Sequence, residues 1–241
     1  MPSAWLGTLA GAEINQAKIT LANAVNAITI AGAETITGGT LADNITLTTA
    51  ITSAGVIDLK AGVDTLTLAA GDNVATISNA ETITTAGSGD DTITLGAAQT
   101  AGSINLGTGA DAITLAAGNN TLTLTSIESI TGDTGNDTIT LGAAQTGTID
   151  LAAGSDALTL ANGTNTLTVS NVESITGNSG ADTLTLGTTV TGGNFNLASG
   201  ADSLTLLSTG TAANILTATG IETLRSEEHT SELQSHLMIS Y

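Results

Sequence analysis

A nine-residue unit recurs along most of the sequence, and it constrains the fold more than any other feature. Its clearest copy is at residues 132–140, the first nine residues of GDTGNDTITL. The pattern is G-x-x-G-x-D-x-U-x, where U is a large aliphatic residue. Close copies occupy residues 38–46, 86–94 and 177–185. A unit this short cannot bury its apolar face alone, so its copies must stack on one another. The repeat therefore predicts a solenoid.

Each unit contains the pattern Z-x-U-x-U, and from residue 17 onward the residue at Z follows a cycle of five types. Ala17, Asn26 and Glu34 precede the first complete cycle. The complete cycles are Asp43, Gly55, Asp64, Asn73, Glu81; Asp91, Gly102, Asp111, Asn120, Glu128; Asp137, Gly147, Asp156, Asn165, Glu173; and Asp182, Gly193, Asp202, Asn214, Glu222. The opening Asp recurs after 48, 46 and 45 residues, so five units make one long repeat.

The alternation of residue types within a unit predicts which side chains face inward. Ile139 and Leu141 are two residues apart and share one face of a strand, while Thr138 and Thr140 share the other. The aliphatic face must point inward, and the β-branched threonines suit an exposed strand face. Turns rich in Gly, Asn, Asp and Ser leave no room for helices. We therefore expect an all-β, right-handed parallel β-solenoid: a β-roll with two units per coil, or a three-sided β-helix as the alternative.

Composition excludes several classes of protein. The chain has one Phe, one Trp and one Tyr, which suits a thin, repetitive core. Its formal net charge of -19 repels nucleic acid and anionic membrane surfaces and attracts cations. There is no cysteine, hence no disulfide, and no apolar run is long enough to span a membrane. The opening MPSAWLG shows neither the basic nor the apolar part of a secretory leader.

The two ends of the chain depart from the repeat. Residues 1–16 fit the pattern loosely and are interpreted as the degenerate start of a truncated repeat, followed by the solenoid at residues 17–224. Residues 225–241, RSEEHTSELQSHLMISY, contain both histidines and the only arginine, and they resemble the translation of a sequencing-library adapter. We predict that this tail is an artefact, disordered or a short helix; a genuine amphipathic terminal helix is the alternative.

The glycine-rich turn followed by D-x-U-x resembles haemolysin-type (RTX-like) calcium-binding β-roll repeats, and the long repeat resembles the β-strand repeats of bacterial surface-layer and adhesin proteins. The resemblance implies calcium bound by turn carbonyls and by Asp carboxylates of successive coils. The implied ligands are Asp43, Asp64, Asp91, Asp111, Asp137, Asp156, Asp182 and Asp202. The turn glycines match only in part, and the alternative is that Asp and Asn at Z cap their own turns.

Outward-facing T-x-T pairs, such as Thr121/Thr123 and Thr183/Thr185, resemble the ice-binding faces of β-solenoid antifreeze proteins. In the Gly unit, however, the outward residue is Asp or Asn, as at Asp150 and Asn196, which interrupts the rows. We expect ordinary exposed strand threonines. No catalytic residue is predicted, because residues 17–224 contain no His, Cys or Arg and the serines have no base partner.

These observations predict a structural repeat region of a secreted, surface-layer or adhesin-like bacterial protein, located outside the cell or on its surface, with folding aided by Ca²⁺. The expected partners are calcium ions and either neighbouring copies or cell-surface glycans, without nucleic acid or membrane insertion. The alternatives are a metal-independent structural or adhesive solenoid and, less favoured, an ice-binding module.

Overall fold

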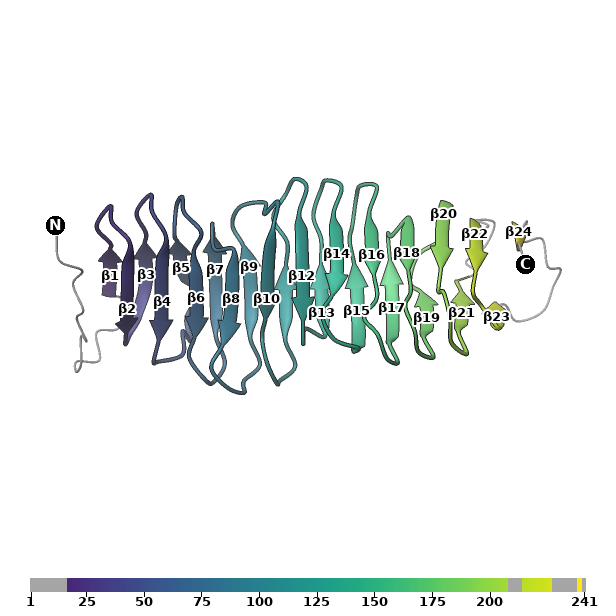
Figure 1. The fold of residues 1–241 in the computed structure, drawn as a ribbon, viewed down its shortest axis with the longest axis horizontal. Helices are drawn as coiled ribbons and strands as arrows, with labels where there is room; N and C mark the ends of the chain where they lie inside the picture. Colours follow the sequence, from purple (N-terminus) through teal and green to yellow (C-terminus); the bar gives the residue numbers. More distant parts are fainter. Residues whose placement is uncertain (1–16, 208–213, 227–237, 240–241) are drawn as a thin grey trace. The chain divides into compact units, whose positions relative to one another are not determined.

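The chain is a parallel β-solenoid in which successive strands alternate between two sheets (Figure 1). The structure, a computed structural model, describes residues 17–207, 214–226 and 238–239. Every regular element within these residues is a β-strand. Two strands therefore make one coil, as the nine-residue spacing predicted, and the three-sided alternative is not adopted. No helix long and apolar enough to cross a membrane is found among the described residues.

The strands divide between two compact units. The first contains residues up to Ala116 together with Thr125–Ile127. Its strands are β1 (Ala17–Thr20), β2 (Asn26–Ile30), β3 (Ala33–Thr37), β4 (Asp43–Leu47), β5 (Gly55–Asp58), β6 (Thr65–Leu68), β7 (Val74–Ser78), β8 (Thr82–Thr85), β9 (Thr92–Leu95), β10 (Gly102–Asn105) and β11 (Ala112–Thr114). The odd-numbered strands form one parallel sheet in the order β1-β3-β5-β7-β9-β11, and the even-numbered strands form the other, β2-β4-β6-β8-β10.

The second unit contains Ala117–Leu124 and the chain from Glu128 onward. Its strands are β12 (Thr121–Thr125, whose last residue belongs to the first unit), β13 (Ser129–Thr131), β14 (Thr138–Leu141), β15 (Thr146–Asp150), β16 (Ala157–Thr159), β17 (Thr166–Ser170), β18 (Ser174–Thr176), β19 (Thr183–Leu186), β20 (Thr191–Asn196), β21 (Ser203–Leu206), β22 (Ile215–Thr219), β23 (Thr223–Ser226) and β24 (Met238–Ile239). One parallel sheet runs β13-β15-β17-β19-β21-β23, and the other runs β12-β14-β16-β18-β20-β22-β24.

Pairing register places equivalent residues of successive units beside one another. In β14 and β16, Ile139 pairs with Leu158 and Thr140 with Thr159. Ile139 and Leu158 are buried, at 0% and 1% exposure, whereas Thr138 is exposed. The predicted inward aliphatic and outward threonine faces are thus confirmed, and the core is a stack of Ile and Leu rows between the two sheets.

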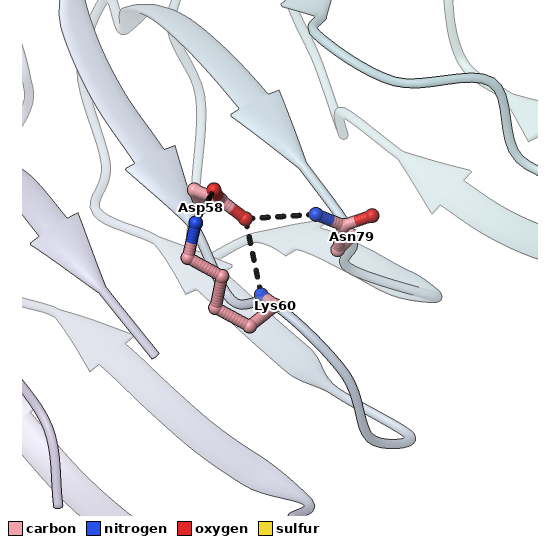
Figure 2. A network of polar contacts seen from close by, with 3 residues as sticks. All are labelled: Asp58, Lys60 and Asn79. Atoms are coloured by element: carbon pink, nitrogen blue, oxygen red, sulfur yellow. Dashed lines mark hydrogen bonds and ion pairs between the residues drawn. The ribbon is translucent and has the colours of Figure 1, made fainter. Parts of the chain in front are cut away.

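The turns on the outer surface are fixed by Asp and Asn side chains. Figure 2 shows Asp58 between Lys60 and Asn79: its carboxylate accepts the Lys60 backbone N–H (3.1 Å), an ion pair from Lys60 Nζ, and a hydrogen bond from Asn79 Nδ2 (2.7 Å). Asp150 makes the same backbone bond to Ala152 (3.0 Å). Lys60 and Ala152 both have left-handed φ values, 73° and 64°, and the Asp side chain stabilises this turn.

Glycine is required where one coil lies directly against the next. A Cβ atom built on Gly154 would overlap the carbonyl oxygen of Gly135 and lie 2.8 Å from Oδ1 of Asp156. The absence of a side chain lets successive turns approach to sheet spacing.

The tail predicted as an artefact is described only in part. Arg225 and Ser226 complete β23, and β24 pairs in parallel with β22. Residues 227–237, 240 and 241, and the predicted degenerate start at residues 1–16, lie outside the described residues.

Candidate functional site

The Asp residues at Z face the interior of the solenoid. Asp137, Ile139 and Leu141 are two residues apart and share the inward face of their strand, so the Asp continues the row of buried aliphatics. All eight Asp residues predicted as calcium ligands are at most 1% exposed. They are Asp43, Asp64, Asp91, Asp111, Asp137, Asp156, Asp182 and Asp202. A buried carboxylate is costly unless hydrogen-bonded, and the partners of each group therefore matter.

These side chains bind the backbone of the neighbouring coil. At the turns that lead into even-numbered strands, hereafter the even edge, Asn120 donates its backbone N–H and its Nδ2 to Oδ1 of Asp137, at 2.8 and 2.9 Å. The Asp137 N–H donates to Oδ1 of Asp156 (2.7 Å), and the Asp156 N–H donates to Oε2 of Glu173 (2.8 Å). Each side chain thus accepts the N–H of the Z residue one coil earlier. We call this run of Asn, Asp, Asp and Glu a ladder.

The same ladder recurs on the odd edge, at the turns that lead into odd-numbered strands. Asn165 donates its N–H and Nδ2 to Asp182, both at 2.9 Å. Asp182 then donates to Asp202 at 2.8 Å, and Asp202 to Glu222 at 2.7 Å. We call each nine-residue unit a rung. Because a long repeat has five rungs and a coil has two, successive ladders lie on alternate edges.

The first unit repeats the arrangement. On its even edge, Asn26 Nδ2 donates to Asp43 (2.6 Å), the Asp43 N–H to Asp64 (2.7 Å) and the Asp64 N–H to Glu81 (2.7 Å). On its odd edge, Asn73 donates to Asp91, and the Asp91 N–H donates to Asp111, each bond being 2.8 Å. The bonds are charge-assisted hydrogen bonds in a water-poor interior, the strong class of such interactions.

Asn and Glu occupy the two ends of the ladder for different reasons. The amide of Asn73 also donates to Ala69 O (2.9 Å) and Gly71 O (2.8 Å) in its own turn, which a carboxylate cannot do. The backbone N–H of Glu173 donates back to the carbonyl of Asp156 (3.2 Å). It therefore needs no acceptor from the following coil, and the ladder can end there. The predicted capping of own turns is seen for Asn73 and for Asp43, whose Oδ2 accepts the Gly39 N–H of its own turn (3.0 Å). Glu at the corner closes the ladder.

The Gly rung follows each Glu, and another side chain fills the place of its missing one. Ile51 is 2% exposed, and a Cβ built on Gly55 would lie 2.5 Å from its Cγ2. Val190 fills the same place, 2.6 Å from a Cβ on Gly193. The Ile51 N–H donates to Oδ1 of Asn73 (3.1 Å), which connects the Gly rung to the next ladder. Glycine is therefore required at Gly55 and Gly193 because the preceding turn residue points inward. At Gly147 a Cβ would instead overlap the backbone carbonyl of Glu128.

Burial makes Asp64, Asp156 and Asp202, each the second Asp of its ladder, hard to ionise. Oδ2 of Asp64, Asp156 and Asp202 is buried without a hydrogen-bond partner among the described residues. Burial raises the pKa of Asp156 to about 6. The hydrogen bond from the Asp137 N–H lowers this pKa, whereas the negative charges of Asp137 and Glu173 raise it. The pKa values of Asp64 and Asp202 are raised for the same reasons. Burial also raises the pKa of Asp91 in the odd-edge ladder.

The carboxylates predicted as calcium ligands are engaged with the backbone of neighbouring coils. Calcium takes six to eight oxygen ligands. Here the carboxylates point into the core and use Oδ1 for a backbone N–H, and no group of three or more His, Cys, Asp or Glu side chains within the described residues could hold a metal ion. Ligation at the Asp rows would need these side chains to turn outward. The calcium sites stay a prediction.

The ladder was missed in the sequence although its signal is present there. The pattern Z-x-U-x-U places Z at the same period of two as the buried aliphatics, which predicts an inward side chain. Interpreting Asp as a surface turn residue set this period aside.

Threonine ranks line the outer faces of the sheets. In the second unit, Thr166 pairs with Thr183 and Thr168 with Thr185 across β17 and β19. One strand earlier, Asp150 of β15 pairs with Ser170 of β17. The ranks are therefore regular over short stretches and contain acidic interruptions.

No protein-family model matches the chain, and no curated protein matches it. A comparison with solved structures finds similarity to the X-ray crystal structure of a hyperactive, Ca²⁺-dependent, beta-helical antifreeze protein from an Antarctic bacterium. The identity is 18%, the match covers 92% of this chain and 83% of that chain, and the TM-score is 0.30.

Proposed function

We propose that this chain is a structural solenoid, a spacer or lattice element within a longer secreted or cell-surface protein of the surface-layer or adhesin kind. The observation that carries the proposal is the ladder. Its carboxylates, the most reactive groups of the repeat, are buried and engaged with backbone N–H groups of neighbouring coils. Groups used in this way stabilise the stack and are withheld from substrates.

The ladder also supports stacking that does not depend on metal. Each Oδ1 or Oε2 acceptor satisfies a backbone N–H that would otherwise be buried and unpaired at the edge of the core. Leaving such a group unsatisfied costs about 1–3 kcal/mol. A solenoid is stabilised by the sum of its nearest-neighbour contacts, so a bond repeated at most coils has a large total effect.

Calcium bound at the Asp rows is the competing proposal, and it is supported by the sequence resemblance and by the acidic charge. It predicts that Asp137→Ala with Asp156→Ala lowers calcium uptake measured by titration calorimetry. Unchanged uptake would remove it. Neighbouring copies of the chain or cell-surface glycans remain the proposed partners of the outer faces.

Pulling the full chain between two handles in calcium chelator tests the structural role. Residues 17–224 extend to on the order of 700 Å at ~3.4 Å per residue. We expect force-resisting steps whose summed length approaches this value, less the folded length. Smooth stretching without steps in chelator would contradict a metal-independent, load-bearing solenoid.

A further inference from the structure

The ladders on the two edges are interrupted at different heights. Between a Glu rung and the following Gly rung on the same edge, no side chain can continue the ladder, because glycine has none. Main-chain pairing still crosses this step: the Thr148 N–H donates to Glu128 O, and the Asn194 N–H to Glu173 O, each at 2.8 Å. At the Glu34–Gly55 step the exposed Ser53 hydroxyl also donates to Oε1 of Glu34 (3.0 Å), outside the row of Z residues. We call such a step a break.

Each break lies opposite the middle of the ladder on the other edge. The chain winds continuously, so the rung between Glu128 and Gly147 in sequence lies between them in height, on the other edge. That rung is Asp137, which accepts the Asn120 N–H and donates its own N–H to Asp156. Asp182 occupies the same place opposite the break between Glu173 and Gly193.

The first unit shows the same relation. Asp91 lies between Glu81 and Gly102 in sequence, and it accepts from Asn73 and donates to Asp111. The Ser103 N–H to Glu81 O bond (2.8 Å) crosses that break. Asp43, between Glu34 and Gly55, likewise accepts from Asn26 and donates its N–H to Asp64.

We infer that the odd number of rungs per repeat is a device that staggers the two ladders, so that every break on one edge is bridged by an intact ladder on the other. With an even number, each residue type would stay on one edge, and all breaks would fall there. The ladder on that edge would then be interrupted at every Gly rung. Staggering leaves the stack without a plane that is weak on both edges, which is the property a load-bearing spacer needs. The inference rests on the proposed function only for that benefit.

Amide hydrogen exchange of the full-length Asp156→Ala protein tests the bridge. The substitution removes the acceptor of the Asp137 N–H. The lost bond lies on the even edge, at the height where two successive steps of the odd edge meet. One is the break, reported by the Thr148 N–H. The other is the step from Gly147 to Asn165, where the Gln145 N–H donates to Asn165 Oδ1 (3.2 Å); the Thr166 N–H, which donates to Gln145 O (3.0 Å), reports it.

We expect the Thr148 N–H to exchange roughly 5- to 150-fold faster than in the wild-type protein, as for loss of one buried hydrogen bond. The Thr166 N–H should change less than about threefold, because the side-chain bond beside it persists. Asp156→Asn, which keeps the Oδ1 acceptor, should restore both rates. Equal acceleration of the two N–H groups, or no change at Thr148, would overturn the inference.

The other edge provides an independent copy of the test in case Asp156→Ala does not fold. In Asp202→Ala, the Asn194 N–H reports the break, and the Ile215 N–H, which donates to Val190 O (2.8 Å), reports the connected step. The same contrast is expected there. Neither outcome depends on the pulling experiment: a weak wild-type solenoid would refute load-bearing, while equal exchange at the two reporters would refute the stagger alone.

Discussion

Raising the pH from 4 to 7 should destabilise the solenoid, and Asp156 should account for a measurable part of the loss. Its pKa rises from 3.8 in the unfolded chain to about 6 in the folded one, mainly through burial. The folded state therefore binds more protons than the unfolded state between these values. The free energy of unfolding falls as pH rises through this window. The stabilisation from protonated Asp156 is fully present below pH 3.8 and is lost as the pH rises through about 6.

The size of the effect follows from the shift. A shift of about 2 pKa units corresponds to at most about 3 kcal/mol for Asp156, and to less where solvent reaches the carboxylate. Asp64 and Asp202 shift in the same direction and add to the loss. The pKa of Asp58 is lowered: burial raises it, but the hydrogen bonds and charge of Lys60 and the Asn79 amide together outweigh burial. The stabilisation from Asp58 is therefore fully present above pH 3.8 and is lost only as the pH falls below that value.

The assay is urea unfolding at several pH values between 4 and 8, for the wild-type and Asp156→Asn proteins. Asparagine keeps the Oδ1 acceptor and is already accommodated at the equivalent positions Asn73 and Asn165. We expect Asp156→Asn to be less pH-dependent and more stable at pH 7. Asp58→Asn is the control, with an unchanged slope in this window. Stability that rises between pH 4 and 7, or an unchanged slope in Asp156→Asn, would refute the electrostatic reasoning.

Three further changes test the turns and faces. Gly154→Ala should destabilise the protein by about 1–3 kcal/mol or more, because its Cβ overlaps Gly135 O; chemical denaturation measures this, with exposed Ser155→Ala as the neutral control. Lys60→Ala should cost less than about 1 kcal/mol in the same assay, since its ion pair is exposed and Ala152 already holds the equivalent left-handed turn; a larger loss would mean the pair is structural. A thermal hysteresis assay should show no ice-growth inhibition, because the threonine ranks contain Asp150; clear hysteresis would favour the ice-binding alternative.

The period of the sequence was sufficient to predict the solenoid. Ile139 and Leu141 point inward, Thr138 points outward, and the spacing near nine gives two strands per coil. These features follow from strand geometry and from the need to bury aliphatic side chains, which act within one unit.

The ladder could be predicted only in part. The inward direction of Asp137 follows from the same period of two, but its partners lie 17 and 19 residues away, at Asn120 and Asp156. Identifying them requires the number of rungs per coil, for which the spacing near nine favoured two and kept three as the alternative. Once two is known, the order Asn, Asp, Asp, Glu along each edge can be read from the cycle of five.

The Gly rung depended on information that no single unit contains. Gly55 matches no ligand pattern, and the side chain of Ile51, in the preceding turn, fills the space beside it. The length of this turn differs from one repeat to the next. The raised pKa of Asp156 likewise depends on Asp137 and Glu173 in neighbouring coils. Both properties arise from stacking, so they become visible only in the three-dimensional structure.

Circular dichroism of the full chain, first in excess chelator and then during a calcium titration, tests the central claim most directly. If the ladders and aliphatic rows hold the stack, the spectrum will be β-rich in chelator and will change little up to millimolar calcium. A disordered spectrum in chelator that becomes β-rich as calcium is added would contradict this account and make calcium at the Asp rows the basis of folding.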